Sequence, residues 1–442
     1  MRFFILLSVC AFAFAGEAAH AAPPAPAPIS APDWNGLYAG FDIGVAANST
    51  SHKTSSTFTP YAFDTFTHVG NYATGIGFHL GYNYQLPGPF VVGVEGSLDL
   101  PNGQYREFGP TQDFLMKLDT VYTVAGRAGV LVTPRTLVYG KIGASQMALE
   151  GIDGFGTNFQ QTVGATTYGI GVEGLITDNI LLRVEATDTK ANSDVVLNSG
   201  FDAYRPEVLQ VKAGASVKID PLPNLRSKDT AWTWWKPVTR SWTGVFAGGG
   251  VGIDSGRTDY FSTTFGDFGP YTDTGTTYGV FAGADLQLPN WIAVLPTVVI
   301  GVQYANDWMH AAFDTSAGTG LVAPDYHFAT ISRVSAVTGR VGLLVTPSVL
   351  AYFRGGPAWM RFTAEPGYFN AINAASGAGT STLNATQFGL GIETFLTDHL
   401  ALRVEALNTT SRDEVVLNGI LPADTRLSPS VTTGTVSLLA KF

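Results

Sequence analysis

Apolar and polar residues alternate along many short stretches of this chain. In residues 76–85 the even positions are apolar or aromatic: Ile76, Phe78, Leu80, Tyr82 and Tyr84. The odd positions between them are glycine or polar. A period of two residues puts each set of side chains on its own face of a β-strand. The two tyrosines close one end of the apolar face, as aromatic residues do at a membrane interface.

The same alternation predicts two series of strands. The first series lies near 36–46, 72–85, 90–99, 118–131, 136–148, 164–175, 180–190 and 207–219. The second lies near 244–254, 275–288, 296–306, 331–345, 349–361, 383–395, 400–411 and 430–442. Short turns at 86–89, 133–135 and 177–179 alternate with long polar connections. Short turns on one rim and long loops on the other are typical of an outer-membrane β-barrel.

Sequence motifs show that the chain contains a tandem repeat. Leu-Arg-Val-Glu-Ala occurs at 182–186 and again at 402–406, and Trp34-Asn-Gly-Leu-Tyr38 returns as Trp242-Thr-Gly-Val-Phe246. A period of about 210 residues matches a whole small domain and is too long for a solenoid unit. We therefore expect barrel repeats at 34–219 and 241–442.

The number of barrels depends on the segment between the repeats. Residues 220–240 are far longer than the tight turn that a single cylinder of sixteen strands would need there. Each repeat also has its own first-strand motif. The expected fold class is therefore all-β, with two tandem, antiparallel, up-and-down membrane barrels of eight strands. The alternative is one porin-like barrel of sixteen strands.

The first 33 residues predict export from the cytoplasm. Arg2, an apolar segment and Ala19-His20-Ala21 have the pattern of a signal peptide over 1–21, and 22–33 is a Pro/Ala-rich leader. The only cysteine, Cys10, lies within that signal. The mature chain then has no disulfide and no cysteine ligand for a metal. A net charge of −10 with no basic stripe argues against nucleic acid as a partner.

Charged residues at strand positions of the opposite parity are expected inside the barrels. In the first repeat these are Glu95, Arg127, Lys141, Glu173, Arg183 and Glu185; in the second they are Arg340, Arg354, Glu393, Arg403 and Glu405. A barrel of about eight strands has an interior that side chains can fill. Because an unpaired interior charge is costly, near-balanced charges favour a plug over an open pore. Gln303 stands where the first repeat has Glu95, which predicts a local positive excess that an acidic loop residue such as Asp307 could offset.

The sequence also offers one candidate for catalysis. His79 has the parity of the inner face, and with Ser97 or a carboxylate it could form a hydrolase triad. The second repeat has Phe281 at this position, and a lone interior histidine is more often structural. No loop has the spacing of a calcium site, and no phosphate-binding glycine loop is present. We therefore assign no catalytic, cofactor-binding or metal-binding residues and expect a protein that is not an enzyme.

Several motifs resemble those of one known family. They are Trp-x-Gly-x-Tyr from Trp34, Gly-Val-Glu-Gly at 93–96, Gly-Arg-x-Gly at 126–129, and the Gly-Val-Glu to Leu-Arg-Val-Glu segment at 171–185. Together they resemble the small eight-stranded outer-membrane proteins of alphaproteobacteria, which are related to the OmpA membrane domain and the opacity proteins. That family normally has one copy of the repeat. The resemblance implies a Gram-negative outer-membrane location and makes the terminal Phe442 an expected signal for the barrel-assembly machinery.

The functional expectation follows from a filled barrel. The favoured hypothesis is a non-enzymatic protein that supports envelope integrity and presents loops for surface contact. Its expected partners are outer-membrane lipid with lipopolysaccharide, and the assembly machinery during biogenesis; the sequence does not identify a loop ligand. The alternatives are a porin for small solutes, which needs the sixteen-stranded closure, and a lipid-modifying enzyme acting through His79.

Overall fold

The structure of the protein is a computed structural model. It describes residues 33–55, 63–108, 113–152, 157–197, 202–219, 241–262, 266–289, 297–315, 326–364, 379–417 and 425–442. The signal peptide, nearly all of the leader, the 220–240 segment and the tips of the long connections lie outside these residues. No helix in the described part of the chain is long and apolar enough to cross a membrane.

The first repeat forms a closed antiparallel barrel. Its strands are β1 (Gly36–Ser55), β2 (Phe63–Gln85), β3 (Phe90–Leu100), β4 (Gly103–Phe108), β5 (Asp113–Thr133), β6 (Thr136–Ile152), β7 (Asn158–Leu175), β8 (Ile180–Ala191), β9 (Val195–Leu197) and β10 (Asp202–Ile219). Strand β4 continues β3 along β5, and β9 continues β8 along β10. The two strands of each such pair occupy one position in the ring, so the barrel is eight-stranded. The ring closes because β1 pairs with β10, from Leu37 opposite Ile219 to Thr54 opposite Asp202.

The second repeat closes in the same way. Its strands are β11 (Gly244–Ser262), β12 (Gly266–Gln287), β13 (Val298–Thr315), β14 (Tyr326–Thr346), β15 (Val349–Ala364), β16 (Gly379–Phe395), β17 (Leu400–Ser411), β18 (Val415–Leu417) and β19 (Thr425–Lys441). Strand β18 continues β17 along β19. Pairing of β11 with β19, from Phe246 opposite Lys441 onward, closes this ring.

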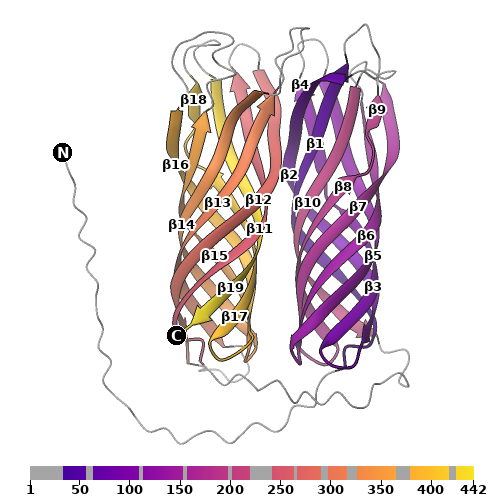
Figure 1. Ribbon diagram of the computed structural model, residues 1–442. Coiled ribbons are helices and arrows are strands. Elements are labelled where there is room, and N and C mark those ends of the chain that lie inside the picture. Colours follow the sequence, from indigo (N-terminus) through magenta and orange to yellow (C-terminus); the bar gives the residue numbers. More distant parts are fainter. Residues whose placement is uncertain are drawn as a thin grey trace, which may run out of the picture.

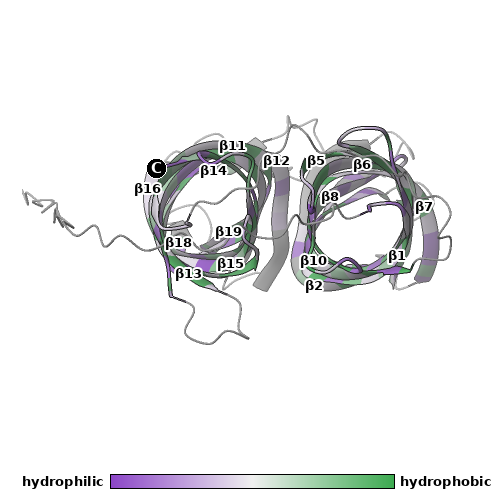
Figure 2. Ribbon diagram, turned by 90° about the horizontal axis from the view of Figure 1, so that it is seen from below, coloured by the Kyte–Doolittle hydropathy of each residue, from purple (hydrophilic) through white to green (hydrophobic). Residues whose placement is uncertain are grey.

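Two barrels therefore form, and the alternative of one sixteen-stranded barrel is wrong. The rings stand side by side with their axes nearly parallel (Figure 1), and the end-on view shows two separate cylinders (Figure 2). In the described residues the ladder crosses from one ring to the other at a single pair, Val69 opposite Tyr271. A sixteen-stranded cylinder would instead need β10 to pair with β11 and β19 with β1.

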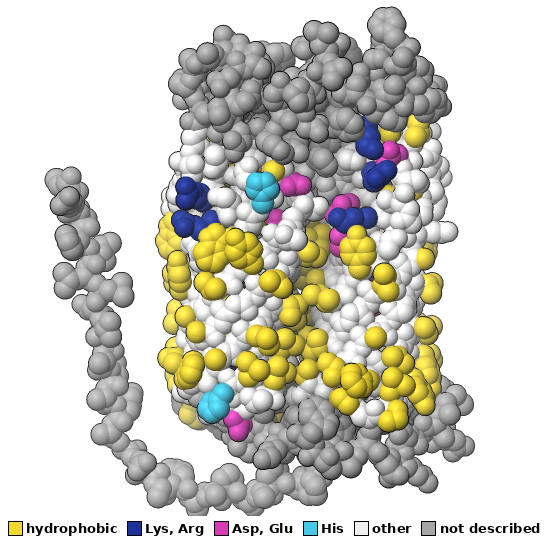
Figure 3. All heavy atoms as spheres, in the orientation of Figure 1, with side chains coloured by type: hydrophobic (Ala, Val, Ile, Leu, Met, Phe, Trp, Pro, Cys, Tyr) yellow, Lys and Arg dark blue, Asp and Glu magenta, His cyan; other side chains and the backbone are white. Residues whose placement is uncertain are grey.

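The outer surface confirms the predicted strand parity. Outward side chains such as Phe78, Val124 and Ile142 are 51%, 71% and 65% exposed. Apolar side chains form a broad band around the lower part of both barrels, and charged side chains gather near the upper rim of the visible face (Figure 3). A band that exposes so many large apolar groups is stable only in contact with lipid. The barrels thus present an apolar belt to the membrane.

Most strands extend further toward the long connections than the alternation predicted. Strand β5, for example, starts at Asp113 rather than near 118. In this extra part the pattern is inverted, since Met116 and Leu118 are buried inside the barrel while Lys117 and Asp119 face outward. Above the lipid the outer wall meets water, so polar groups favour the outside and apolar groups fill the interior. A search for apolar residues on the outer face therefore ends each strand too early.

Apolar residues close the interior of each barrel at both ends. In the first barrel the end near the short turns is filled by Trp34, Val91, Leu131, Leu137, Tyr139, Leu175 and Leu181. The loop end is filled by a larger cluster that includes Met116, Leu118, Met147, Leu149, Tyr204 and Val208. The second barrel has corresponding clusters around Trp242 and around Phe313. The polar interior residues lie between these two layers.

Tryptophan anchors the first strand of each repeat, which explains the shared Trp-x-Gly motif. The Trp34 indole N–H donates to the Pro134 carbonyl at 3.0 Å, and the Trp242 indole donates to the Pro347 carbonyl at 3.0 Å. The glycines that follow, Gly36 and Gly244, have φ values of 121° and 150°. These angles favour glycine, because a side chain would be strained there. The motif thus turns the chain into β1 and β11 while the indole covers the end of the barrel.

Candidate functional site

All eleven charged residues predicted for the interior are buried there. Their exposures range from 0% for Glu185, Glu393 and Arg403 to 6% for Lys141. They come from β3, β5, β6, β7 and β8 in the first barrel, and from β14 to β17 in the second. The ladder places Arg127 opposite Lys141, and Arg340 opposite Arg354. Adjacent cations on neighbouring strands require carboxylates between them, and the two networks supply these.

Arg127 is at the centre of one half of the first network. Its guanidinium donates to both oxygens of Glu173, at 2.9 and 2.6 Å, and to Glu95 at 3.2 Å. The same group donates to the hydroxyl of Tyr38, which in turn donates to Glu95. A bidentate arginine–carboxylate pair combines charge with fixed geometry. Tyr38 of the Trp-x-Gly-x-Tyr motif is therefore a member of the charge network.

Arg183 is at the centre of the other half. It donates two hydrogen bonds to Asp42, at 2.8 and 2.6 Å, and one to Glu95 at 2.8 Å. Lys141 bonds Glu185 at 2.6 Å and Glu95 at 3.2 Å. Glu95 thus accepts hydrogen bonds from three cationic side chains and links the two halves into one cluster.

Three members of the first network were missed by the sequence analysis. Asp42 binds Arg183, and Lys212 bonds Asp99 at 2.7 Å. Strand parity places all three residues inward, so the signal was present. Asp42 and Lys212 have uncharged counterparts in the second repeat, Gly250 and Thr435, whereas Asp99 matches Asp307. With them, Asp42, Glu95, Asp99, Glu173 and Glu185 face Arg127, Lys141, Arg183 and Lys212.

The second barrel builds a related network from different partners. Arg340 pairs with both oxygens of Asp285 and with Glu393 at 2.9 Å. Arg403 donates twice to Glu393, at 3.1 and 2.8 Å. Lys441, the last residue of β19, reaches Asp285 and Glu393 at 2.9 Å each. Arg354 lies 3.0 Å from Glu405.

A carboxylate outside the prediction offsets part of the positive charge around Gln303. Gln303 accepts a hydrogen bond from Arg403 at 2.6 Å, and Asp285 supplies the negative charge that Glu95 supplies in the first barrel. Asp307 was expected in a loop but lies in β13. There it lines a small interior pocket together with Arg354 and Glu405. With Asp307 included, four carboxylates face the four cations of this network; the others are Asp285, Glu393 and Glu405.

His79 lies inside the first barrel, as its parity predicted, but its partners differ from those expected. Its Nδ1 is 2.9 Å from Asp42 and its Nε2 is 2.7 Å from the hydroxyl of Ser216. Ser97, the predicted partner, hydrogen-bonds to Asp99 instead. The Asp42–His79–Ser216 order resembles a hydrolase triad in its spacing. All three residues are at most 4% exposed, however, and Asp42 is also held by Arg183.

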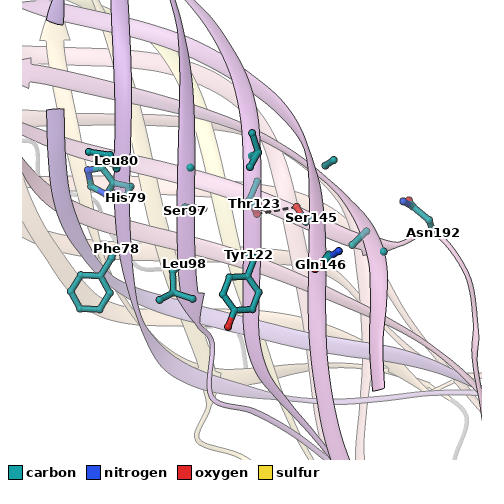
Figure 4. Close-up of a pocket in the computed structure, with 15 residues that line it drawn as sticks. Phe78, His79, Leu80, Ser97, Leu98, Tyr122, Thr123, Ser145, Gln146 and Asn192 are labelled. Atoms are coloured by element: carbon teal, nitrogen blue, oxygen red, sulfur yellow. Dashed lines mark hydrogen bonds between the residues drawn. The ribbon is translucent and has the colours of Figure 1, made fainter. Parts of the chain in front are cut away.

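A surface pocket beside His79 lies on the lipid side of the wall. It crosses β2, β3, β5, β6 and β7, and its exposed lining is formed by outward residues such as Phe78, Leu80 and Tyr122. Figure 4 shows Phe78, Leu98 and Tyr122 on three neighbouring strands, with the Thr123–Ser145 hydrogen bond of the inner face nearby. The His79 side chain is itself buried, and the exposed residues of this depression belong to the apolar belt that faces the membrane. Among the described residues, no group of three or more acidic, histidine or cysteine side chains could hold a metal ion.

The closed rings, apolar belt and charged interiors define a transmembrane β-barrel protein. The family model described as outer membrane protein beta-barrel domain matches residues 6–216 and again 237–442. The chain therefore belongs to this family, carries its domain twice and is located in the Gram-negative outer membrane.

Individual proteins similar to this chain come from several bacteria. The 25 kDa outer-membrane immunogenic protein of Brucella ovis is 32% identical over 185 residues, which is 41% of this chain and 82% of that protein. Among solved structures, Ail of Yersinia pestis is 16% identical and covers 41% of this chain and 99% of its own, with a TM-score of 0.25. The toluene transporter TodX of Pseudomonas putida is 10% identical and covers 91% and 89%, with a TM-score of 0.26.

Proposed function

We propose that this protein is a non-enzymatic component of the outer membrane whose two plugged barrels support envelope integrity and present loops for surface contact. One observation carries the proposal: in each barrel a hydrogen-bonded charge network lies between two apolar layers. Water or solute passing through would have to separate both layers and break buried ion pairs. Each broken pair would leave an uncompensated charge, at a cost of about 3–5 kcal/mol.

The porin hypothesis is the first rival, and conductance distinguishes the two. A porin of this chain was expected to need sixteen strands in one ring, whereas β1–β10 and β11–β19 pairing closes two smaller rings. We expect purified full-length protein to give no discrete conductance steps in planar bilayers. A general porin inserted in the same lipid serves as the positive control. Steady, reproducible steps from this protein would contradict the plug.

The enzyme hypothesis is the second rival, and the Asp42–His79–Ser216 hydrogen bonds favour testing it. The second barrel has Phe281 at the position of His79, so His79→Phe is a substitution that the scaffold already accommodates. We expect wild-type protein in detergent to hydrolyse short-chain nitrophenyl esters and phospholipids no faster than buffer. Hydrolysis that disappears in His79→Phe, while heat-modifiable gel migration is unchanged, would establish an enzyme instead.

The surface-contact part of the proposal draws support from the Brucella relative, which is described as immunogenic. Loops that reach the immune system must be outside the cell. We expect an epitope tag inserted at 316–325 or 365–378 to bind antibody on intact cells, and a tag inserted at 220–240 to bind only after permeabilisation.

The envelope role predicts that deleting the gene raises sensitivity to detergent and bile salts, and that the wild-type gene restores resistance. Unchanged sensitivity would remove that part of the proposal.

A further inference from the structure

A patch on the outer wall of each barrel is withdrawn from lipid. Five outward apolar residues, Val172, Val184, Val349, Ile392 and Val404, form one buried cluster with exposures of 2–6%. Outward residues elsewhere on the same walls, such as Val124 and Val251, are 71% and 67% exposed. The cluster joins β7 and β8 of the first barrel to β15, β16 and β17 of the second. The two barrels therefore bury these side chains against each other.

The two sides of this contact are the same positions of the repeat. Glu173 pairs with Arg183 across β7 and β8, and Glu393 pairs with Arg403 across β16 and β17, which fixes the correspondence of the repeats. On this correspondence Val172 matches Ile392, and Val184 matches Val404. An interface built from one face used twice is the mark of two-fold symmetry. Here the symmetry is approximate and relates two parts of one chain.

Contacts between matching positions mark where the pseudo-two-fold axis passes. Val69 is paired with Tyr271, its own counterpart in the second repeat. Beside them, a side chain added at Gly70 would meet the Asn48 carbonyl of its own barrel and also, at 2.8 Å, the hydroxyl of Thr272, the counterpart of Gly70. Closer to the middle of the barrels, a Cβ added at Gly434 would lie 3.3 Å from the Cγ2 atom of Val211. Val211 and Gly434 also match, since they pair with Val45 and Ile253 on the first strand of each repeat.

At two of these axial sites one repeat has glycine and the other has a larger residue. The first barrel contributes Gly70 and Val211, and the second contributes Thr272 and Gly434. In a pair of identical barrels each axial residue would meet itself, so two first barrels would place valine on valine and two second barrels would place threonine on threonine. Pairing the first barrel with the second avoids both clashes. The hydroxyl of Thr272 also donates to Ser49 of the first barrel at 2.9 Å.

We propose that this outer face is a recognition surface through which the two barrels hold together as a pseudo-two-fold pair, specific for the sister repeat and independent of the covalent linker. In a bilayer no hydrophobic gain separates protein from lipid contact, so close packing at small residues drives such association. The glycine and valine at the axis allow close packing in one combination and prevent it in the others.

Disulfide trapping tests the contact in the full-length protein. The only native cysteine, Cys10, lies in the predicted signal peptide, so introduced cysteines report without interference. The Cβ built at Gly434 is 3.3 Å from the Cβ of Ala186, close to the separation of about 3.8 Å found in disulfides. We expect Ala186→Cys/Gly434→Cys, with a protease site inserted in 220–240, to form the disulfide within one chain. It should therefore migrate as a monomer before cleavage and release its halves only after reduction. Ala186→Cys/Gly339→Cys is the control, because a Cβ at Gly339 has nothing within 4 Å.

Exchanging the axial residues tests the specificity. After linker cleavage in mild detergent, wild-type halves should co-elute, and Gly434→Val should abolish co-elution because two valines then meet. The lipid-facing Gly339→Val should leave co-elution unchanged. Val211→Gly/Gly434→Val, which exchanges the two residues, should restore it. Heat-modifiable migration of each half verifies that both barrels are folded. Crosslinking of the 186/434 pair no greater than that of the 186/339 pair, or wild-type halves that separate on cleavage, would overturn the proposal.

Discussion

Removal of Arg183 isolates the contribution of the charge network to stability. In Arg183→Met the side chain keeps much of its volume and loses three hydrogen bonds, two to Asp42 and one to Glu95. Glu95 retains Arg127 and Lys141, each at 3.2 Å. Asp42 keeps its hydrogen bond with His79 but loses the cation that bonds to it directly. The variant therefore leaves one buried carboxylate short of a cation.

The expected cost follows from that unpaired carboxylate. Breaking a buried ion pair from one side costs about 3–5 kcal/mol. With a urea dependence of about 2 kcal/mol per M, the midpoint for the first barrel should fall by about 2 M. Asp42→Asn/Arg183→Met removes the orphaned charge as well and should recover a large part of the loss. The matched control is Arg403→Met, in which Glu393 retains Arg340 and Lys441, each at 2.9 Å, so the loss should be smaller.

Urea titration of the full-length protein in detergent measures these effects separately for each barrel. A protease site in 220–240 allows the halves to be resolved after equilibration, and heat-modifiable migration reports the folded fraction of each. Equal midpoints for wild type, Arg183→Met and the double variant would refute the reasoning, because the network would then contribute nothing to stability. A loss in the double variant as large as in the single variant would instead attribute the cost to lost packing.

Two further predictions concern interior packing and a loop-side ion pair. Gly81→Val should prevent folding of the first barrel, because a Cβ there would lie within 3 Å of the Tyr38 ring. The control Gly126→Val should fold normally, because Gly126 faces lipid and a Cβ there has nothing within 4 Å. Gel migration of unheated samples distinguishes folded from unfolded protein. Burial raises the pKa of Asp194, but hydrogen bonds from Lys53 and Arg205 outweigh it and hold the pKa below its usual value. A carboxyl group with a lowered pKa adds stability above about pH 4, and this stability is lost as the pH falls further. The protection of backbone amides against hydrogen exchange in the segment that joins β8 to β9 should therefore decrease in acid. Asp194→Asn should remove this pH dependence, and a variant that kept it would show that another group is responsible.

The hydrophobic pattern predicted the fold because each strand of a membrane barrel alternates between side chains that face lipid and side chains that face the interior. Outward residues contact hydrocarbon and are therefore apolar, so the sequence shows which residues of a strand face outward. Phe78 and Val124 are exposed as expected. The strand ends failed for a related reason. Beyond the lipid the same wall meets water, and residues such as Met116 turn inward while Lys117 turns outward. The pattern inverts without any break in the strand.

The candidate interior was predicted by position but not by partner. Parity placed Arg183 and Arg403 inside, since charge on the outer face would be costly in lipid. It did not reveal that Arg183 binds Asp42 while Arg403 binds Glu393. Partners depend on the stagger of the closed ring, which brings β1 beside β10 from opposite ends of the repeat. His79 was likewise placed inside, and only the closed ring put it beside Ser216.

The sequence by itself determined the strands, their faces and the ionic character of both interiors, because alternation within short segments records them. It also determined the duplication, which the repeated motifs record. Only the tertiary structure decided that there are two rings, which residues pair within them and which outward residues leave the lipid. Val184 and Val124 have the same parity and the same chemistry, yet one is 4% exposed and the other 71%. Lipid hydrocarbon and a neighbouring barrel both favour apolar side chains. The difference in exposure between these two valines therefore depends on which side of the first barrel packs against the second.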